Sequence, residues 1–454
     1  MPGQISGGRP ASPSVGRHSG PQDASGSPAV TGNASADAVN ATPKKKRDNG
    51  RTEDHFDPAN GSASHQVGIS VADDSPANDG VSVVAAKRVD VAPGKSGLVS
   101  ENVRALQELY GVTENLGRPR ERIVHWLARI QDALISAADG AGPVKSVADT
   151  ANRYLQSNLR LDVFYLEGIL KLYKKSHPEI SAIFDDVKAF EDALGVASGA
   201  RSALSAAQKL PELPAPALAW LEVQVREADA ALHAEIQKNW QVDQKGHVPV
   251  FSRLVQELTN GSWDMYGADK KNLVAELDRR LKKFQKADMD MGVLQGDTGV
   301  HELRRQLRWI PIYAVALDGL FRFDDARHPI DAYANLMDTD LVHSKYAQLP
   351  PSHREKSPIP FSRSLYLRIT QLIDELGRIK DDGESIEAIA HALLASGCAA
   401  DLHDATSQAE KILGVPPGSE DVVFAQAKTI YDEMQAHHFI RAVRDEVRER
   451  KRAS

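Results

Sequence analysis

From Ser100 onward, apolar residues recur at spacings of three and four, and this spacing constrains the fold more than any other feature of the chain. Val103, Leu106 and Tyr110 form one such set. Residues spaced in this way share one face of an α-helix, whereas the alternating pattern of a strand is nearly absent. The sequence therefore predicts an all-α fold built from helical bundles.

Capping residues, glycines and prolines bound the helices that this spacing predicts. The predicted helices cover residues 100–111, 120–138, 144–177, 180–195, 215–240, 250–258, 270–286, 298–323, 362–377, 385–395, 406–413 and 420–450. Two of them, 180–195 and 362–377, end in the same order of residues: an apolar residue, any residue, Asp, any residue, Leu and Gly. This similarity hints at two related halves, although Leu-Gly is also a common helix C-terminus.

The first 97 residues differ in composition from the rest of the chain. Ser, Gly, Ala, Pro, Asp and Asn dominate them, and large apolar residues are scarce. Such a segment buries too little apolar surface to offset its ordering entropy, so residues 1–97 are predicted to form a disordered leader. Within it, Pro43-Lys44-Lys45-Lys46-Arg47 has the form of a nuclear-localisation run, although short basic runs in tails are usually solvated charge.

Charge and cysteine content narrow the class of protein. The 454 residues carry a formal net charge of -7, which argues against nucleic acid as a partner, so any anion site must be a local basic patch. Cys398 is the single cysteine, which excludes an intramolecular disulfide and fits a reducing, cytoplasmic compartment. The most apolar run, 309–323, is shorter than the roughly 20 residues that span a bilayer, so no membrane span is expected.

The sequence contains no enzyme motif that we recognise. Neither a metal-ligand spacing of His, Cys and Asp nor a nucleophile motif is present. His437 and His438 are adjacent, so on a helix they project about 100° apart and make a poor chelate. We therefore expect a protein that is not an enzyme and that needs neither metal nor cofactor.

One predicted helix is unusually basic for an acidic chain. The run Gly299–Pro311, GVHELRRQLRWIP, contains His301, Arg304, Arg305 and Arg308. On a helical wheel with His301 at zero, the three arginines fall at about 300°, 40° and 340°, so all four side chains share an arc of roughly 100° and form a cationic stripe. The apolar residues of the same helix gather on its opposite side, at Leu303, Leu307, Ile310, Ala314 and Leu317.

Two interpretations of the cationic stripe stay open. Outer helix faces usually mix charges of both signs, but here Glu302 is the only acid, and it is expected to point away from the stripe. The preceding helix adds Arg280 and Lys283, and residues 270–310 hold ten Lys or Arg against six Asp or Glu, a local charge of +4. This pattern favours an anion-binding face, while solvated charge and internal salt bridges are the alternative.

Arginine suits phosphate because its planar guanidinium donates two parallel hydrogen bonds to one phosphate. A histidine beside the arginines can add a third donor, and a bound polyanion raises its pKa and keeps it charged. The candidate anion-binding residues are therefore the stripe and its two neighbours, namely His301, Arg304, Arg305, Arg308, Arg280 and Lys283.

The stripe and one later motif resemble the CHAD domain, an α-helical family. Such domains have two similar halves, each with a His-x-x-Arg helix followed by a Leu-Gly-x-x-x-Asp motif. His301, Arg304 and Arg308 are similar to the first motif, and Leu376-Gly377-Arg378-Ile379-Lys380-Asp381 to the second. The resemblance implies binding of inorganic polyphosphate along a basic channel.

The chain departs from the family pattern at several positions. Pro311 and Ile312 stand where the family has an arginine and an aromatic residue. In the first half, 154–173 has no His-x-x-Arg, and Leu194-Gly195 lacks the following aspartate. The predicted organisation is a leader (1–97), an N-terminal helical bundle (98–245), a second helical bundle (246–400) and C-terminal helices (401–454). The resemblance to the CHAD domain applies to the second bundle.

Two functions are consistent with these observations. The first is a helical module that binds polyphosphate or another polyanion. The alternative is a bacterial effector or scaffold that acts on a protein partner, with the leader serving in targeting and the KKKR run directing it to a host nucleus. The motivation for the alternative lies in the composition of residues 1–97.

Overall fold

The computed structural model describes residues 106–111, 117–139, 146–157, 159–263, 267–344, 347–350, 355 and 357–448. All of them belong to one compact unit, Val67–Ser454. The predicted leader, including Lys44 to Arg47, lies outside the described residues. The predicted subdivision of the helical part stays a prediction.

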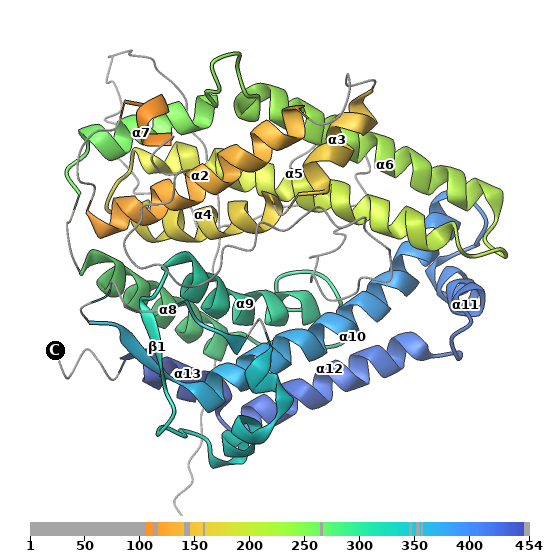
Figure 1. Ribbon diagram of the computed structural model, residues 1–454. Helices are drawn as coiled ribbons and strands as arrows, with labels where there is room; N and C mark the ends of the chain where they lie inside the picture. The colour runs from red at the N-terminus through yellow and green to blue at the C-terminus, as the bar shows by residue number, and fades with distance from the viewer. Residues whose placement is uncertain are drawn as a thin grey trace, which may run out of the picture. The chain divides into compact units, whose positions relative to one another are not determined.

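The protein is all-α, as the apolar spacing predicted (Figure 1). The elements of the first half of the described chain are α2 (Arg118–Asp139), α3 (Val147–Leu155), α4 (Leu159–Tyr173), α5 (Ile180–Ala207), α6 (Ala215–Glu235), the π-helix η1 (Ile236–Trp240) and α7 (Pro249–Asn260). The elements of the second half are α8 (Ala268–Lys286), α9 (Val300–Ala316), β1 (Phe321–Asp324), the 3-10 helices η2 (Asp331–Asp338) and η3 (Asp340–His343), β2 (Ile359–Ser362), α10 (Arg363–Ala395), α11 (Leu402–Leu413), α12 (Ser419–Ala436) and α13 (Phe439–Arg448).

Two predicted helices are each broken in two. The helix predicted at 144–177 is split into α3 and α4, because the hydroxyl of Ser157 donates to Tyr154 O at 3.0 Å and accepts from Leu159 N at 3.3 Å. The helix predicted at 420–450 is split into α12 and α13 at His437-His438, where His438 has a left-handed φ of 49°. In both cases the apolar spacing predicted a continuous helix across the break.

The two Leu-Gly motifs were predicted to end helices, and both predictions are wrong. Gly195 lies inside α5, which continues to Ala207, and Gly377 lies inside α10, which joins the helices predicted at 362–377 and 385–395. A Cβ at Gly195 would lie 2.6 Å from Arg160 Nη2, and one at Gly377 would lie 3.2 Å from Arg304 Nε. Both glycines therefore make room for an arginine that crosses the helix.

The strand content is limited to one short pair in the described part of the chain. β1 and β2 are parallel, with Phe321 opposite Ile359. The helix predicted at 298–323 thus ends earlier, at Ala316, and the chain turns through Asp318 (φ 32°) and Gly319 (φ 78°) into β1. None of the described helices is long and apolar enough to cross a bilayer.

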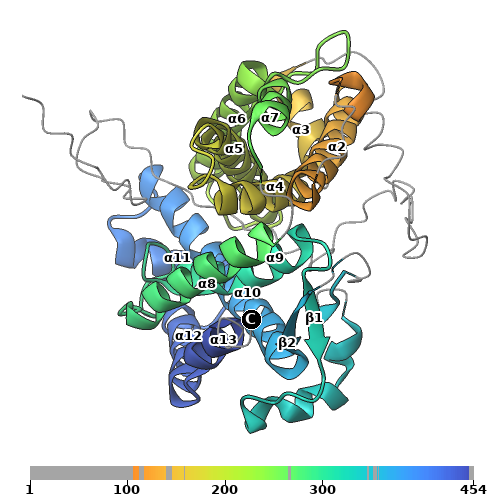
Figure 2. The ribbon, with the colours of Figure 1, turned by 90° about the vertical axis from the view of Figure 1, so that its left-hand side faces the viewer.

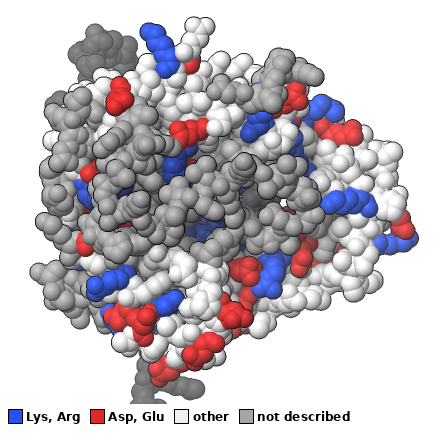
Figure 3. All heavy atoms as spheres, viewed as in Figure 1, with Lys and Arg blue, Asp and Glu red and all other residues white. Residues whose placement is uncertain are grey.

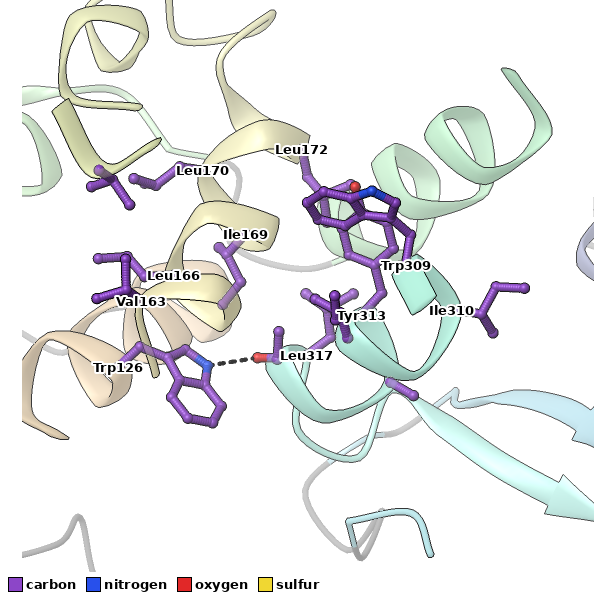
Figure 4. Close-up of a cluster of buried hydrophobic side chains, with 14 of the residues drawn as sticks. Trp126, Val163, Leu166, Ile169, Leu170, Leu172, Trp309, Ile310, Tyr313 and Leu317 are labelled. Carbon is purple, nitrogen blue, oxygen red and sulfur yellow. Dashed lines mark hydrogen bonds between the residues drawn. The ribbon is translucent and has the colours of Figure 1, made fainter. Parts of the chain in front are cut away.

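The core joins the two halves of the described chain through α4 and α9. Helices α2 to α7 lie on one side of this contact, and α8 to α13 lie on the other (Figure 2). Apolar side chains of α4 face Trp309 and Tyr313 of α9, and Trp126 of α2 donates through Nε1 to Ala316 O at 3.0 Å (Figure 4). The contact thus places the cationic helix α9 at the middle of the molecule rather than at its edge.

Candidate functional site

The basic helix forms as α9, and its apolar side is the one that the sequence predicted. Its core side chains are fully or almost fully buried, at Leu303, Leu307, Ile310, Ala314 and Leu317. Pro311 lies inside the helix. A proline there cannot donate a backbone hydrogen bond, so α9 lacks one intrahelical bond at this point. The opposite side carries the four predicted cationic residues, but their surroundings differ greatly.

Arg304 is buried, with 2% of its surface exposed. Its Nε donates to Ile373 O of α10 at 3.1 Å. Burial lowers the pKa of Arg304, while the α10 acids Asp381, Glu384 and Asp374 oppose this shift. The guanidinium is therefore part of the contact between α9 and α10, and a solvent-borne polyanion cannot reach it without opening that contact.

His301 is not cationic at neutral pH. Burial and the neighbouring Lys380, Arg305 and Arg304 lower the pKa of His301 to about 4. Its Nδ1 is buried without a hydrogen-bond partner. Lys380 is itself fully buried and pairs with Asp381 at 3.1 Å and Glu384 at 2.9 Å. His301 therefore adds no charge to the stripe in this state.

Arg305 is the predicted residue of α9 that faces solvent, with 51% of its side chain exposed. It pairs with Glu302, whose Oε2 lies 2.5 Å from Arg305 Nε. Glu302 is only 8% exposed and also accepts from Gln306. The expectation that Glu302 points away from the cationic side chains is therefore wrong: it neutralises one of them.

Arg280 and Arg308 both lie against aromatic rings. The Arg280 guanidinium is 4.5 Å from the ring centre of Trp309, and its Nε donates to Glu276 at 2.7 Å. The Arg308 guanidinium is 5.2 Å from the ring centre of Phe164 on α4, and burial lowers its pKa to about 10. Lys283, one turn beyond Arg280 on α8, is exposed.

Two lysines outside the predicted set of anion-binding residues lie against the neighbouring aromatic rings. Lys171, on α4, lies 5.0 Å from the ring centre of Trp309 and 5.9 Å from that of Phe184 on α5. Lys174 follows α4 and lies 3.8 Å from the Phe184 ring centre. The run Lys171-Leu172-Tyr173-Lys174-Lys175 was the signal in the sequence, but only the contact between α4 and α9 shows which aromatic rings the lysines meet.

These contacts define a seam of cations on aromatic rings between α4, α5, α8 and α9. We call it the Trp309 seam, and its members are Lys171, Lys174, Arg280, Arg308, Phe164, Phe184 and Trp309. A cation over an aromatic ring is worth about 0.5–2 kcal/mol. Its remaining N–H groups can still donate hydrogen bonds to a second partner. A buried acid, Glu167, lies beside these cations. Burial raises the pKa of Glu167, while Lys171, Lys188 and Arg280 oppose this shift.

Two arginines, the half-buried Arg160 and the buried Arg304, occupy matching places in the two halves of the described chain. Arg160 of α4 crosses α5 at Gly195 and donates through Nε to Glu191 Oε1 at 2.9 Å. Arg304 of α9 crosses α10 at Gly377 and donates to Ile373 O, so in both cases the acceptor lies four residues before the glycine. We call these the first and second arginine crossings. They support the hint of two related halves.

The fold and these contacts define a class, an all-α protein in which cations from several helices meet on buried aromatic rings. Within the described residues, no group of three His, Cys, Asp or Glu side chains could hold a metal ion. No family model, curated protein or solved structure matches this chain. The resemblance to the CHAD domain therefore stays an expectation.

Proposed function

We propose that this protein binds a polyanion at the Trp309 seam, with inorganic polyphosphate as the model ligand. One observation carries the proposal: Lys171 of α4 and Arg280 of α8 lie against the same indole ring, at 5.0 Å and 4.5 Å from its centre. Two cations from helices that are distant in sequence are held close together. Glu276 and the buried Glu167 offset part of their mutual repulsion, and a bound anion would offset more.

The predicted cationic stripe contributes to this site unequally. Arg308 belongs to the seam, whereas Arg305 and Lys283 are exposed cations that are not among its members. Arg304 lies in the contact between α9 and α10, and His301 is neutral, so neither has a direct part in binding. On the face drawn in Figure 3, the Lys and Arg side chains of the described residues are interspersed with Asp and Glu.

Polyphosphate binding would follow from charge and would therefore depend steeply on salt. The test is the double variant Lys171→Met/Arg280→Met, since methionine keeps an unbranched apolar stem against Trp309 while it removes both charges. We expect polyphosphate affinity to fall at least tenfold, because hydrogen bonds to charged groups contribute about 1.5–3 kcal/mol each. Isothermal titration calorimetry at two salt concentrations measures both the affinity and its salt dependence.

The control is Lys428→Met/Arg226→Met, which removes two exposed cations from α12 and α6. It should bind polyphosphate as the unaltered protein does. Lys171→Met alone keeps the pair of Arg280 with Glu276 and guards against a folding defect in the double variant. If both seam variants melt normally and bind polyphosphate with unchanged affinity, the proposal fails.

The alternative function, an effector or scaffold, depends on residues 1–97, which lie outside the described residues. It stays a prediction. Deleting residues 1–97 and following the localisation of the remaining chain tests it, because an unchanged location would remove its support.

A further inference from the structure

A pocket of about 520 Å³ lies where α12 meets α13, against the segment that follows β1. Three histidines and two arginines line it: His328, His437, His438, Arg327 and Arg441. None of them belongs to the Trp309 seam. Its volume is in the range of pockets that hold small molecules, which is about 300–1,000 Å³.

A buried network holds Arg327 and His328 of this lining in place. Ser362 of β2 is fully buried; its amide donates to Glu446 Oε2 at 3.3 Å and its hydroxyl to Arg327 O at 2.7 Å. Glu446 Oε1 also pairs with Arg327 Nη2 at 3.2 Å. The imidazole Nδ1 of His328 is 3.3 Å from Ser364 Oγ. The strand β2 and helix α13 thus fix the position of Arg327 and His328.

The break between α12 and α13 places the other two imidazoles. His437 ends α12, with its amide donating to Glu433 O at 3.1 Å, and its ring lies edge-on to Tyr333 at 5.6 Å between centres. His438 takes the left-handed φ of 49°, a conformation that costs a non-glycine residue about 1 kcal/mol or more. The strained backbone lets both imidazoles line one pocket, which a continuous helix would not do.

The lining holds two guanidiniums and two carboxylates, so its hydrogen-bond donors, and not a net positive charge, suit it to an anion. Glu446 accepts from Ser362 and pairs with Arg327, and Asp445 lies 3.7 Å from Arg441. Helix α13 begins here, and its first intrahelical bond is from Ala442 N to His438 O, so the amides before Ala442 have no intrahelical acceptor. Imidazole, guanidinium and helix-start amides together are the donors that bind phosphate.

We propose that this pocket binds a small phosphorylated molecule, with the phosphate on Arg327, Arg441 and the three histidines and the body of the ligand against Ile330. This site is separate from the Trp309 seam and does not depend on the proposed function. A phosphate ester is favoured over a long polyanion because the donors line a single pocket of about 520 Å³.

Calorimetry on the full chain, with glucose 6-phosphate as the probe and glucose as the uncharged comparison, tests the proposal. We expect glucose 6-phosphate to bind and glucose to give no heat. His438→Gly and Arg441→Gln should each lower the affinity about tenfold, the contribution of one charge-assisted hydrogen bond. Glycine suits a left-handed backbone, so His438→Gly should keep or raise the melting temperature, which separates lost binding from lost folding.

The matched control is Arg226→Gln, an exposed arginine of α6, which should bind glucose 6-phosphate normally. The seam variant Lys171→Met/Arg280→Met should also bind it normally, so that failure of one site is distinguished from failure of the other. No heat with glucose 6-phosphate, equal binding of citrate, or unchanged affinity in both pocket variants would each overturn the assignment to a phosphate ester.

Discussion

The two arginine crossings share a geometry but compensate their charge differently. In the first, Arg160 meets a carboxylate, Glu191, which is 5% exposed. In the second, Arg304 donates to a backbone carbonyl, Ile373 O, and the α10 acids oppose the lowering of its pKa by burial. A glycine inside a helix thus admits a guanidinium in both halves, while the energetics of each crossing depends on what else is buried there.

The crossings should respond to pH in opposite directions. Burial raises the pKa of Glu191 to about 7, so the first crossing is most stable below the ordinary carboxyl pKa and loses stability as pH rises toward 7. Three residues before Arg304 stands His301, whose pKa is lowered to about 4, so the second crossing loses stability as pH falls from about 6.5 toward 4. The matching position in the first crossing is Ser157, which does not titrate in this range.

The largest expected effect comes from Arg160→Met. Removing the cation leaves Glu191 buried without its charged partner, and breaking a buried pair in this way costs about 3–5 kcal/mol. The cost should grow from pH 6 to pH 8, because at the lower pH Glu191 can bind a proton instead. Arg304→Met should cost less, about 1–2 kcal/mol beyond the lost packing, since it leaves no buried carboxylate alone.

Urea denaturation of both variants at pH 6 and pH 8 measures these differences. The double variant Arg160→Met/Glu191→Gln is the control, because removing both charges should recover most of the stability lost in Arg160→Met. Equal costs for Arg160→Met and Arg304→Met at pH 8 would show that the two crossings do not differ as their partners indicate.

The next largest effect that we expect is a loss of stability at the second crossing as the pH falls. Between pH 6.5 and pH 4 the unfolded chain binds a proton at His301 that the folded chain does not, which removes up to about 3 kcal/mol of stability. His301→Gln should abolish this part of the pH dependence while the protein stays folded at pH 7. Free energies of unfolding measured at intervals across this range give the slope, and the same slope in variant and unaltered protein would rule out His301 as its source.

Substituting the two glycines should separate the crossings by a smaller amount. At Gly195 a Cβ would be 2.6 Å from Arg160 Nη2, so Gly195→Ala must shift the guanidinium beside Glu191. The strain should exceed the gain in helix propensity, with a net cost of about 1–2 kcal/mol. At Gly377 the nearest atom is 3.2 Å away, and the better helix propensity of alanine, about 1 kcal/mol, should offset most of the strain. Thermal unfolding of both variants measures the two stability costs. A larger loss of stability for Gly377→Ala than for Gly195→Ala would contradict this prediction.

These glycines also show how far the sequence could predict the fold. The spacing of apolar residues predicted the all-α class and the core side of α9, because burial follows helical periodicity. It could not predict that Leu-Gly continues a helix at Gly195 and Gly377, since the arginine that needs the space is 35 residues away in one case and 73 in the other. The local sequence shows that glycine tends to end a helix, but it does not show that an arginine distant in sequence packs against that glycine.

The candidate sites show the same limit. The sequence could not show that Arg304 is buried or that Trp309 meets Lys171, because both depend on packing between helices. His437 and His438 were placed on a continuous helix, where they diverge. The left-handed backbone at His438 instead brings both to one pocket, where Tyr333, which is distant in sequence, contacts His437 and Phe439.

The smallest effect on stability is expected for Arg305→Gln, and it sharpens the difference between buried and exposed arginines. Arg305 is 51% exposed, and exposed ion pairs contribute about 0–1 kcal/mol, so the free energy of unfolding should change by less than about 0.5 kcal/mol. If the polyanion extends beyond the Trp309 seam to Arg305, polyphosphate affinity should fall a few-fold, and the slope of log affinity against log salt should decrease by about one. Calorimetric titrations at several salt concentrations measure this slope. An unchanged slope would confine the polyanion to the seam, and a large loss of stability would mean that the pair of Arg305 with the buried Glu302 behaves like the arginine crossings.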